Sequence, residues 1–468
     1  MDRLPADGFW WLPEDTEQIP GRLEGEPGNI KLTLLGSFGD EHLQARTITE
    51  DTFRDSAVFP LVNGVIRGKE VTLVNVAKSG ESFSAPGFFQ FTYRPEMILF
   101  GRLVDAEENL VPQAMSIEIS HLLPWYGRSG LEYEVEFVAS ALAQVQWSFR
   151  HPETFTWGAR GYSLTLGSGI DVQRPTNGIA AQERAAFKVR ATVQIPLHTW
   201  ISEVVTPLLS LMRIAVWKDV AIKRIRPVFV DQLGDPLTGG LDETSCDLVL
   251  NRQSMNNGEE PFLSDEDLLF RAADLTDDIL AGFIDVDSQQ GQIREMFLTY
   301  EMEAMTGDDR FLSYVRLLES MHRRLFPPTK SEKAAYANRL EMMLQGLSPA
   351  DQKLVAGRMK FGYEPGLVSR LHALCKPWRV MMREIHGGRQ QLSEELERIA
   401  KHRNYLAHQL TDDERQYDER QVANANLLLT VIFRLNVLKD VGFDVGRAEE
   451  VVRKSTFFIR YVNRHRRP

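Results

Sequence analysis

The segment KHRNYLAH, residues 401–408, holds the residues of this sequence that are best suited to chemistry. The imidazole of His408 can exchange protons near neutral pH, so it can serve as a general acid or base. The guanidinium of Arg403 stays charged and can stabilise a developing anion. Asn404 adds a neutral donor and acceptor directly after the arginine. We therefore take Arg403, Asn404 and His408 as the candidate catalytic residues.

The spacing of this pair does not identify a site, because an Arg followed by four to six residues and a His occurs four times. The four pairs are Arg316/His322, Arg379/His386, Arg403/His408 and Arg460/His465. Context favours the third pair. The helical pattern SEELERIAKHRNYLA leads there into the polar segment TDDERQYDER, and side chains where a helix meets a loop can reach a substrate. The other arginines lie inside predicted helices or in the C-terminal tail.

On a straight helix Arg403 and His408 would point in different directions. Residues five apart are rotated by about 140° and separated by about 7.5 Å along the axis. A bend at the helix end, or a second copy of the chain, would bring the two side chains together.

Other kinds of site lack the residues that they need. There is no Walker A loop, no GxGxxG after a strand, no HExxH and no EF-hand loop. The segment GRSG at 127–130 lacks the spacing of a nucleophile elbow. Cys246 and Cys375 are far apart and form no CxxC pair, which excludes a zinc ribbon or a thioredoxin-like site. We expect no metal and no cofactor.

The composition is that of a soluble globular protein. The chain has 468 residues, 43% hydrophobic and 25% charged, which is enough for two or three domains. Two free thiols suit a reducing cytoplasm. The acidic start, broken by Pro and Gly, is unlike a signal peptide. The most apolar run, Leu427–Leu438, is too short to span a bilayer and contains Arg434. We expect a cytoplasmic protein without a membrane segment.

The charge is distributed unevenly along the chain. The net charge is −11, of which residues 1–300 carry −18 and residues 301–468 carry +7. A basic C-terminal part is compatible with binding to nucleic acid, whereas the acidic remainder would repel it.

The region from Lys31 to Leu197 has the pattern of a β-rich domain. Short runs rich in β-branched and aromatic residues predict strands, among them KLTLLGSF, EVTLVNV, FFQFTYR, MSIEIS, LEYEVEFV, QVQWSF, YSLTLGS and FKVRATVQI. In LEYEVEFV, Leu131, Tyr133, Val135 and Phe137 alternate with three Glu, which predicts an antiparallel sheet with one wet face. The pattern favours a sandwich or barrel, with a helix over Trp200–Trp217 and possible edge strands at RIRPVFVD and CDLVLN.

Beyond about Asn256 the pattern becomes helical. Apolar residues recur at helical spacing in RFLSYVRLLESMHRRLF, and Pro327 ends that segment. Further helices are predicted at Ser331–Leu347, Gly366–His386, Ser393–Tyr405 and Asp418–Lys439. The sequence thus predicts an α+β multidomain protein, with a β-rich domain at 1–255 and an all-α region at 256–468.

The order of several motifs resembles a known family. RNYLAH is similar to the R-polar-x-x-x-H signature of HEPN domains, and RFLSYVRLLESMHRRLF resembles the first HEPN helix of ApeA-type abortive-infection proteins. The N-terminal GFWWLP, the PGRL and LTLLG that follow, and VIRGKEVTLVNV resemble the β-rich domain fused to that HEPN unit. The resemblance covers most of the chain and implies a HEPN helical bundle at about 305–468.

The resemblance implies a metal-independent endoribonuclease of an anti-phage, toxin-like effector that cleaves host RNA, with tRNA favoured. His408 would activate the 2′-hydroxyl, Arg403 would stabilise the charged phosphate, and Asn404 would orient the His or hold a phosphate oxygen. Glu319 and His322, on the first helix, would support the site. We expect the acidic β-rich half to sense a phage-derived trigger, and two helical domains to pair into a dimer or a higher homo-oligomer.

Two other readings remain open. A HEPN-like helical dimer could hold RNA or a protein partner without cleaving it, although a pure scaffold has no use for Arg, Asn and His together. A lectin-like β module with a helical oligomerisation tail would need an aromatic-lined sugar groove. Tryptophans such as Trp125 and Trp157 could line one, but aromatic residues in strands are usually core.

Overall fold

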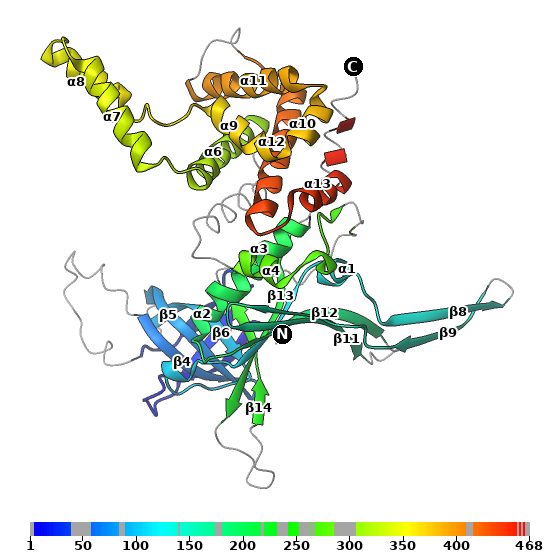
Figure 1. Cartoon of the computed structure of the whole chain (residues 1–468). Coiled ribbons are helices and arrows are strands. Elements are labelled where there is room, and N and C mark those ends of the chain that lie inside the picture. Colours follow the sequence, from blue (N-terminus) through cyan, green and yellow to red (C-terminus); the bar gives the residue numbers. More distant parts are fainter. Residues whose placement is uncertain are drawn as a thin grey trace. The chain divides into compact units, whose positions relative to one another are not determined.

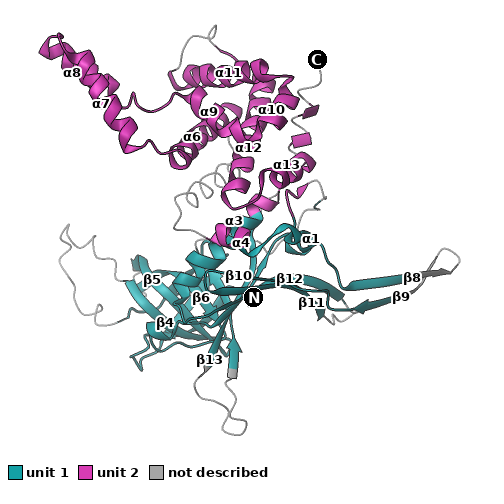
Figure 2. Ribbon diagram, viewed as in Figure 1, with its two compact units in different colours: residues 1–212, 218–263, 271–277 teal, residues 213–217, 264–270, 278–468 magenta. Residues whose placement is uncertain are grey.

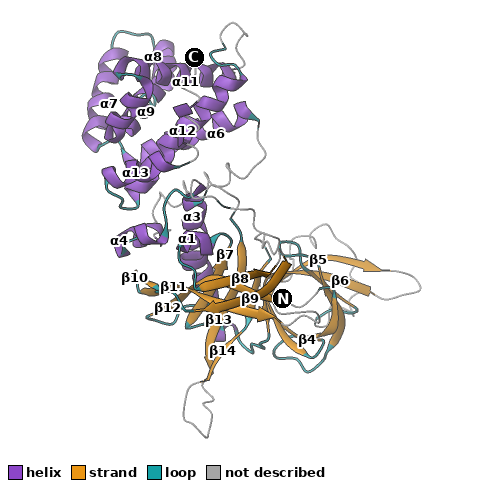
Figure 3. Ribbon diagram, turned by 90° about the vertical axis from the view of Figure 1, so that its right-hand side faces the viewer, coloured by secondary structure: helices purple, strands orange, loops and turns teal. Residues whose placement is uncertain are grey.

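The computed structural model divides the chain into two compact units. It describes residues 4–38, 58–83, 89–138, 141–173, 180–216, 220–231, 242–251, 263, 267–284, 306–408, 415–455, 458–459 and 462–463. Unit 1 contains residues 1–212, 218–263 and 271–277, and unit 2 contains 213–217, 264–270 and 278–468 (Figure 2). The strands belong to unit 1 and the long helices to unit 2 (Figure 3).

Unit 1 is built from antiparallel strands, as the alternating sequence pattern predicts. The strands are β1 (Ala6–Trp11), β2 (Ile19–Glu24), β3 (Lys31–Leu34), β4 (Val58–Ile66), β5 (Lys69–Phe83), β6 (Phe89–Phe100), β7 (Ala114–Ile119), β8 (Leu131–Val138), β9 (Ala141–Phe149), β10 (Phe155–Ala159), β11 (Tyr162–Gln173), β12 (Ala180–Ala191), β13 (Ile222–Asp231), β14 (Asp242–Ser245) and β15 (Asp247–Leu250).

The first six strands close into a barrel. Their order is β6-β3-β2-β1-β4-β5, and β5 pairs back onto β6 (Figure 1). Alternate side chains fill the interior, including the buried Trp10, Leu23, Leu32 and Leu73. Gly64 is required beside Trp10, because a Cβ there would lie 2.3 Å from the indole ring. The barrel confirms the predicted β-rich domain, but β1 and β2 precede the region in which strands were predicted.

The sheet continues beyond the barrel in the order β6-β15-β13-β7-β12-β11-β10, with β14 paired to β13. The prediction of edge strands at RIRPVFVD and CDLVLN was wrong, because β13 and β15 each lie between two neighbours. Leu248, Val249 and Leu250 of β15 are buried accordingly. Two ion pairs to Asp247, from Arg224 at 2.9 Å and Arg226 at 3.0 Å, join these strands.

Strands β8 and β9 form a separate hairpin that projects from unit 1 (Figure 1). Here the predicted alternation is present, but the expected dry face is not. Tyr133 is 71% exposed and Val145 50% exposed, so both described faces of the ribbon meet solvent. The side chains of Glu136 and Phe137 lie outside the described residues.

The predicted helix at Trp200–Trp217 is one helical segment with an irregular turn. It consists of α2 (Leu197–Trp200), a π-helical turn (Ile201–Val205) and α3 (Thr206–Ala215). The indole N–H of Trp200 donates to the carbonyl of Pro112 at 2.9 Å, which fixes the start of the segment on the β unit. Short helical elements of unit 1 are α1 (Leu122–Tyr126) and 3-10 turns at Glu107–Asn109 and Ala272–Asp274.

Unit 2 is a helical bundle with one long excursion. Its helices are α4 (Asp277–Ile284, whose first residue belongs to unit 1), α6 (Gly307–Leu325), α7 (Lys330–Leu344), α8 (Pro349–Met359), α9 (Leu367–Cys375), α10 (Arg379–His386), α11 (Arg389–His408), α12 (Glu419–Asp440) and α13 (Val445–Lys454). The predicted helix Gly366–His386 is divided into α9 and α10 by a 3-10 turn at Lys376–Trp378. Pro377 explains the division, since it has no N–H to continue the helix.

The core of this bundle is α12, which packs against α6, α9 and α13. By length and composition alone, it is the one helix among the described residues that could cross a membrane. Nearly every residue from Val422 to Leu438 is at least partly covered, and Leu428–Leu438 is buried on all sides. It therefore behaves as the central helix of a bundle.

The base of the β8–β9 hairpin provides a test of the fold. Glu183 of β12 accepts hydrogen bonds from Ser129 Oγ at 2.6 Å, Ser168 Oγ at 2.5 Å and the backbone N–H of Gly130 at 2.9 Å. Burial raises the pKa of Glu183, but these donors outweigh it and hold the pKa below its ordinary value.

We expect Glu183→Ala to lower the free energy of unfolding of unit 1 by about 1–3 kcal/mol, since the buried Gly130 N–H loses its acceptor. Chemical denaturation and amide exchange at Gly130 measure the effect. Glu132→Ala, at an exposed position of the same hairpin, is the matched control. Equal behaviour of the two variants would contradict the assigned role of Glu183.

Candidate functional site

The candidate site lies at the C-terminal end of α11. A stripe of Leu392, Leu396, Ile399 and His402 is buried along this helix and fixes it in the bundle. Arg403 follows the last residue of the stripe, so its side chain emerges at the border of the buried face. The predicted helix ended at Tyr405, whereas α11 continues through His408.

Arg403 is held by a carboxylate of α6. Its Nη2 lies 3.8 Å from Oε2 of Glu319, and its Nη1 donates to Oδ1 of Asn404 at 3.1 Å. The side chain of Arg403 is 33% exposed, while that of Glu319 is more enclosed. The three residues that were selected separately from the sequence thus lie together. The loose ion pair positions the guanidinium and leaves part of it open to an anion.

His408 lies at the last described turn of α11 and is exposed. Arg403 and His408 both belong to the single helix α11, and residues five apart on a helix are rotated by about 140°. A bend within α11 therefore does not bring the side chains of Arg403 and His408 together, although a bend was one of the two possibilities considered. The segment 409–414, which contains part of the predicted polar loop, lies outside the described residues.

His322 has a different environment from Glu319, although both lie on α6. It is buried, with its ring 5.0 Å from that of Phe326. Burial lowers the pKa of His322, and the positive charges of Arg370 and Arg323 lower it further. The structure thus places Glu319 beside Arg403, and surrounds His322 with arginines from α9 and α6.

The remaining Arg/His pairs are less suited to a shared site. Arg316 and Arg379 are exposed, whereas their partners His322 and His386 are buried. The fourth pair, Arg460 and His465, lies outside the described residues.

His402 is a site-adjacent residue that the sequence reasoning missed. Its side chain is fully buried, with the rings of Tyr417, Phe311 and Tyr405 at 4.9, 5.0 and 5.7 Å. Its Nε2 lies 3.6 Å from Oδ1 of Asp308, in the first turn of α6. The signal was available, because His402 continues the apolar stripe of α11 at helical spacing. Its packing ties α11 to α6 one residue before Arg403.

Several cationic side chains surround the site, and most of them lie near carboxylates. Around the end of α11, Arg398 lies 3.2 Å from Glu395, Arg415 lies 3.6 Å from Asp308, and Lys401 is exposed. A helix C-terminus presents carbonyl groups and partial negative charge, so an anion there must be bound by side-chain cations. Within the described ranges, no group of three or more His, Cys, Asp or Glu is placed to hold a metal ion.

Comparison with protein families agrees with this arrangement. A model described as ApeA N-terminal domain 1 matches residues 6–279, which is more than half of the chain. The chain belongs to the ApeA family. A second model, Apea-like HEPN, matches residues 312–446. No curated protein and no solved structure matches the chain. The resemblance to ApeA-type proteins that was inferred from the sequence is confirmed.

The ApeA assignment places all the candidate residues in one domain. Glu319, His322, Arg403, Asn404 and His408 fall inside the matched HEPN region, as do most of α6 and all of α7 to α12. HEPN domains are usually ribonucleases, and an ApeA-like HEPN domain indicates an abortive-infection effector.

The buried His402 predicts a pH dependence of stability. Burial lowers its pKa below the ordinary 6.5, and the carboxylate of Asp308 opposes this without overcoming it; Arg415 and Arg398 lower it further. Below about pH 6.5 the unfolded chain then binds a proton more readily than the folded chain, so the free energy of unfolding falls as the pH falls.

We expect His402→Phe to lose less stability than the wild type between about pH 7 and pH 5, because the ring is kept and the titrating group is removed. Denaturant titrations at several pH values measure this. His151→Phe, at an exposed position of unit 1, is the control. A pH profile identical to that of the wild type would refute the assignment.

Proposed function

We propose that this ApeA-family protein is an anti-phage abortive-infection effector whose HEPN domain is a metal-independent endoribonuclease. The observation that carries the proposal is the placement of Arg403. It is held against Glu319 and Asn404 with part of its guanidinium exposed, on the helix that ends at the exposed His408. We favour tRNA as the host RNA, on the basis of the family resemblance alone.

The proposed reaction uses the RNA as its own nucleophile. His408 takes the proton of a ribose 2′-hydroxyl, and the oxygen attacks the adjacent phosphorus. The bond from phosphorus to the 5′-oxygen breaks, and that oxygen receives a proton. Arg403 stabilises the additional negative charge on the phosphate oxygens in the transition state. The products are a 2′,3′-cyclic phosphate and a 5′-hydroxyl.

We propose that two copies of the HEPN domain pair about a two-fold axis to form the active groove. Arg403 and His408 lie on one continuous helix, so their side chains diverge by about 140°. A second copy can place its own motif opposite the first, which supplies an Arg and a His on both sides of one RNA strand.

Substitution at the motif tests the site. We expect Arg403→Ala and His408→Ala each to reduce RNA cleavage at least about a hundredfold, since each removes a group that acts on the reacting phosphate. Unfolding free energy should change by about 1 kcal/mol or less, because both side chains are at least partly exposed. Purified variants are compared on total RNA. Arg379→Ala, an exposed arginine of the same bundle, is the control and should cleave normally.

The nature of the products tests the mechanism. We expect the new 3′ ends to carry a cyclic phosphate, detected by resistance to ligation until the ends are repaired, and cleavage to continue in EDTA. Loss of activity in EDTA would reject the metal-independent mechanism. Wild-type activity in His408→Ala would instead favour a HEPN scaffold that binds RNA without cutting it.

We propose that unit 1 senses the phage-derived trigger. Its acidic sequence disfavours RNA, and the outer face of its barrel has a groove of about 690 Å³. The exposed Phe9 and Leu35 line the groove, beside Arg22, which lies 3.8 Å from Asp7 and 3.6 Å from Glu24. Apolar side chains with a few oriented charges are typical of a binding surface.

We expect Phe9→Asp combined with Leu35→Asp to abolish protection of infected cells while the purified protein still cleaves RNA. Both residues are about half exposed, so the fold should be retained. Plaque assays and RNA cleavage measure the two properties. Val193→Asp, an exposed position outside the groove, is the control. Full protection by the double variant would place the sensor elsewhere.

A further inference from the structure

Two projecting hairpins of this chain expose apolar side chains. The first is the β arm, defined as β8 and β9. Cross-strand pairs of the arm place Tyr133 opposite Trp147 and Val135 opposite Val145, and all four are exposed. A two-stranded ribbon with a solvated apolar face is marginally stable by itself. The arm therefore has reason to be covered by another surface.

The base of the β arm is built firmly, which suits a docking element. Glu183 fixes the entry to β8 through Ser129 and Gly130. The exit from β9 is fixed by Glu153, whose carbonyl accepts hydrogen bonds from Tyr126 Oη at 2.5 Å and Arg128 Nη1 at 2.6 Å. Two clamps from different elements hold the ribbon in one direction.

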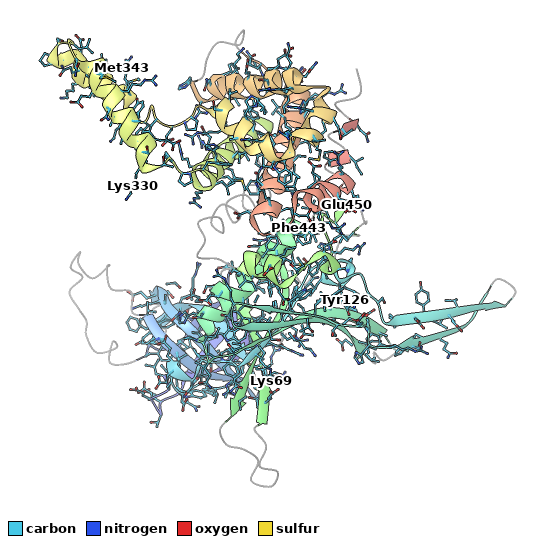
Figure 4. The ribbon with its side chains drawn as sticks, viewed as in Figure 1. Lys69, Tyr126, Lys330, Met343, Phe443 and Glu450 are labelled. Atoms are coloured by element: carbon cyan, nitrogen blue, oxygen red, sulfur yellow. The ribbon has the colours of Figure 1, made fainter. Side chains whose placement is uncertain are left out.

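The second is the helical hairpin, defined as α7, α8 and the connected residues 345–348 and 360–363. Neither helix has a buried residue. The hairpin is held internally, with Tyr336 Oη donating to the carbonyl of Met359 at 2.7 Å. Its exposed apolar side chains are those of Met342, Met343, Leu347, Leu354 and Phe361. Figure 4 draws Lys330 and Met343 at opposite ends of α7.

The charges of the two hairpins are complementary. The β arm, residues 131–149, contains three Glu and no Lys or Arg, whereas residues 330–360 contain six Lys or Arg and three acidic residues. Two of those acids, Glu332 and Asp351, complete the N-terminal caps of α7 and α8 and so lie at the starts of these helices. The helical hairpin carries a net charge of +3, opposite in sign to that of the β arm.

We propose that the β arm of one copy of this chain docks on the helical hairpin of a second copy. Tyr133 and Trp147 would pack against the methionines, since thioether and aromatic groups attract one another, and against the exposed Leu354 and Phe361. In a two-fold dimer the contact occurs twice, with each copy supplying one arm and one hairpin. Every copy carries both surfaces, so the partner is always present in equal amount.

The dimensions and the charges agree with this contact. Strands of eight or nine residues extend about 25–30 Å, and a helix of 15 residues extends about 22 Å. Glu132 and Glu134 alternate with Tyr133 along β8 and so lie on the opposite face of the ribbon, which is thinner than the Debye length of about 10 Å at 0.1 M salt. Attraction between the acidic arm and the basic hairpin is therefore felt across the interface.

Sedimentation velocity of the purified full-length chain tests the proposal independently of RNA cleavage. We expect Tyr133→Ser with Trp147→Ser, and separately Leu354→Ser with Phe361→Ser, to weaken self-association at least about tenfold. Val193→Ser and Val380→Ser, exposed apolar positions outside the two hairpins, are the controls. Association that is unchanged by both pairs of substitutions would overturn the proposal.

An exchange of charges tests whether the β arm and the helical hairpin face each other. Glu132→Lys with Glu134→Lys in the arm should weaken association, as should Lys353→Glu with Lys360→Glu in the hairpin. We expect the chain that carries all four changes to regain association, because both partners have exchanged sign. If the fourfold variant is weaker than either double variant, the two hairpins do not face each other.

Cysteine cross-linking tests whether the β arm of one copy contacts the helical hairpin of another copy. The native Cys246 and Cys375 are buried, and burial raises the pKa of each thiol to about 12, so they give little background. Trp147→Cys and Leu354→Cys are placed on separately tagged copies, and a bismaleimide is added. We expect a mixed dimer between the tags. Cross-linking of Trp147→Cys alone, or only within a doubly substituted chain, would overturn the proposal.

Discussion

The helical unit depends on the burial of α12. A helix that is apolar around its whole circumference must be surrounded, and its own polar side chains then need partners inside the bundle. Asn426 Nδ2 donates to the carbonyl of Gly307 at 3.0 Å, and Asn436 Nδ2 donates to that of Leu374 at 3.2 Å. Arg434 Nη1 donates to the carbonyl of Ile214 at 2.6 Å. These bonds fix the start of α6 and the end of α9 against one central helix.

The geometry of the candidate site depends on these contacts of α12. The start of α6 is held by Asn426, and Asp308, one residue further, meets His402 of α11. Three turns along α6, Glu319 reaches Arg403. The arginine is thus located by two contacts of its helix with the same neighbouring helix. A substitution in α12 would therefore disturb the candidate site through this route.

The sequence predicted the structure correctly where the residue types themselves indicate the chemistry, or where the spacing of apolar residues indicates the secondary structure. Arg403, Asn404 and Glu319 could be selected before their proximity was known, and the antiparallel β domain followed from alternation. The central positions of β13 and β15 in the sheet could not be predicted from the sequence, because β15 pairs with a strand about 150 residues earlier in the chain. The alternation in LEYEVEFV led to the prediction of a buried face. That prediction was wrong because the same alternation occurs in a covered sheet and in an uncovered ribbon. His402 was overlooked because histidine is not an apolar residue and was not counted in the apolar stripe of α11 that it continues.

The two units are not two uninterrupted stretches of the gene. Unit 2 includes residues 213–217 and 264–270, which are joined by the bridge between Val216 and Leu268 and by the bond from Leu269 N to Ala215 O at 2.7 Å. During synthesis, the carbonyl of Ile214 leaves the ribosome some 220 residues before Arg434, its partner in α12. The bundle therefore completes only when nearly the whole polypeptide has been made. Recombination at a single point in the gene cannot exchange either unit intact, so the two units should be inherited together.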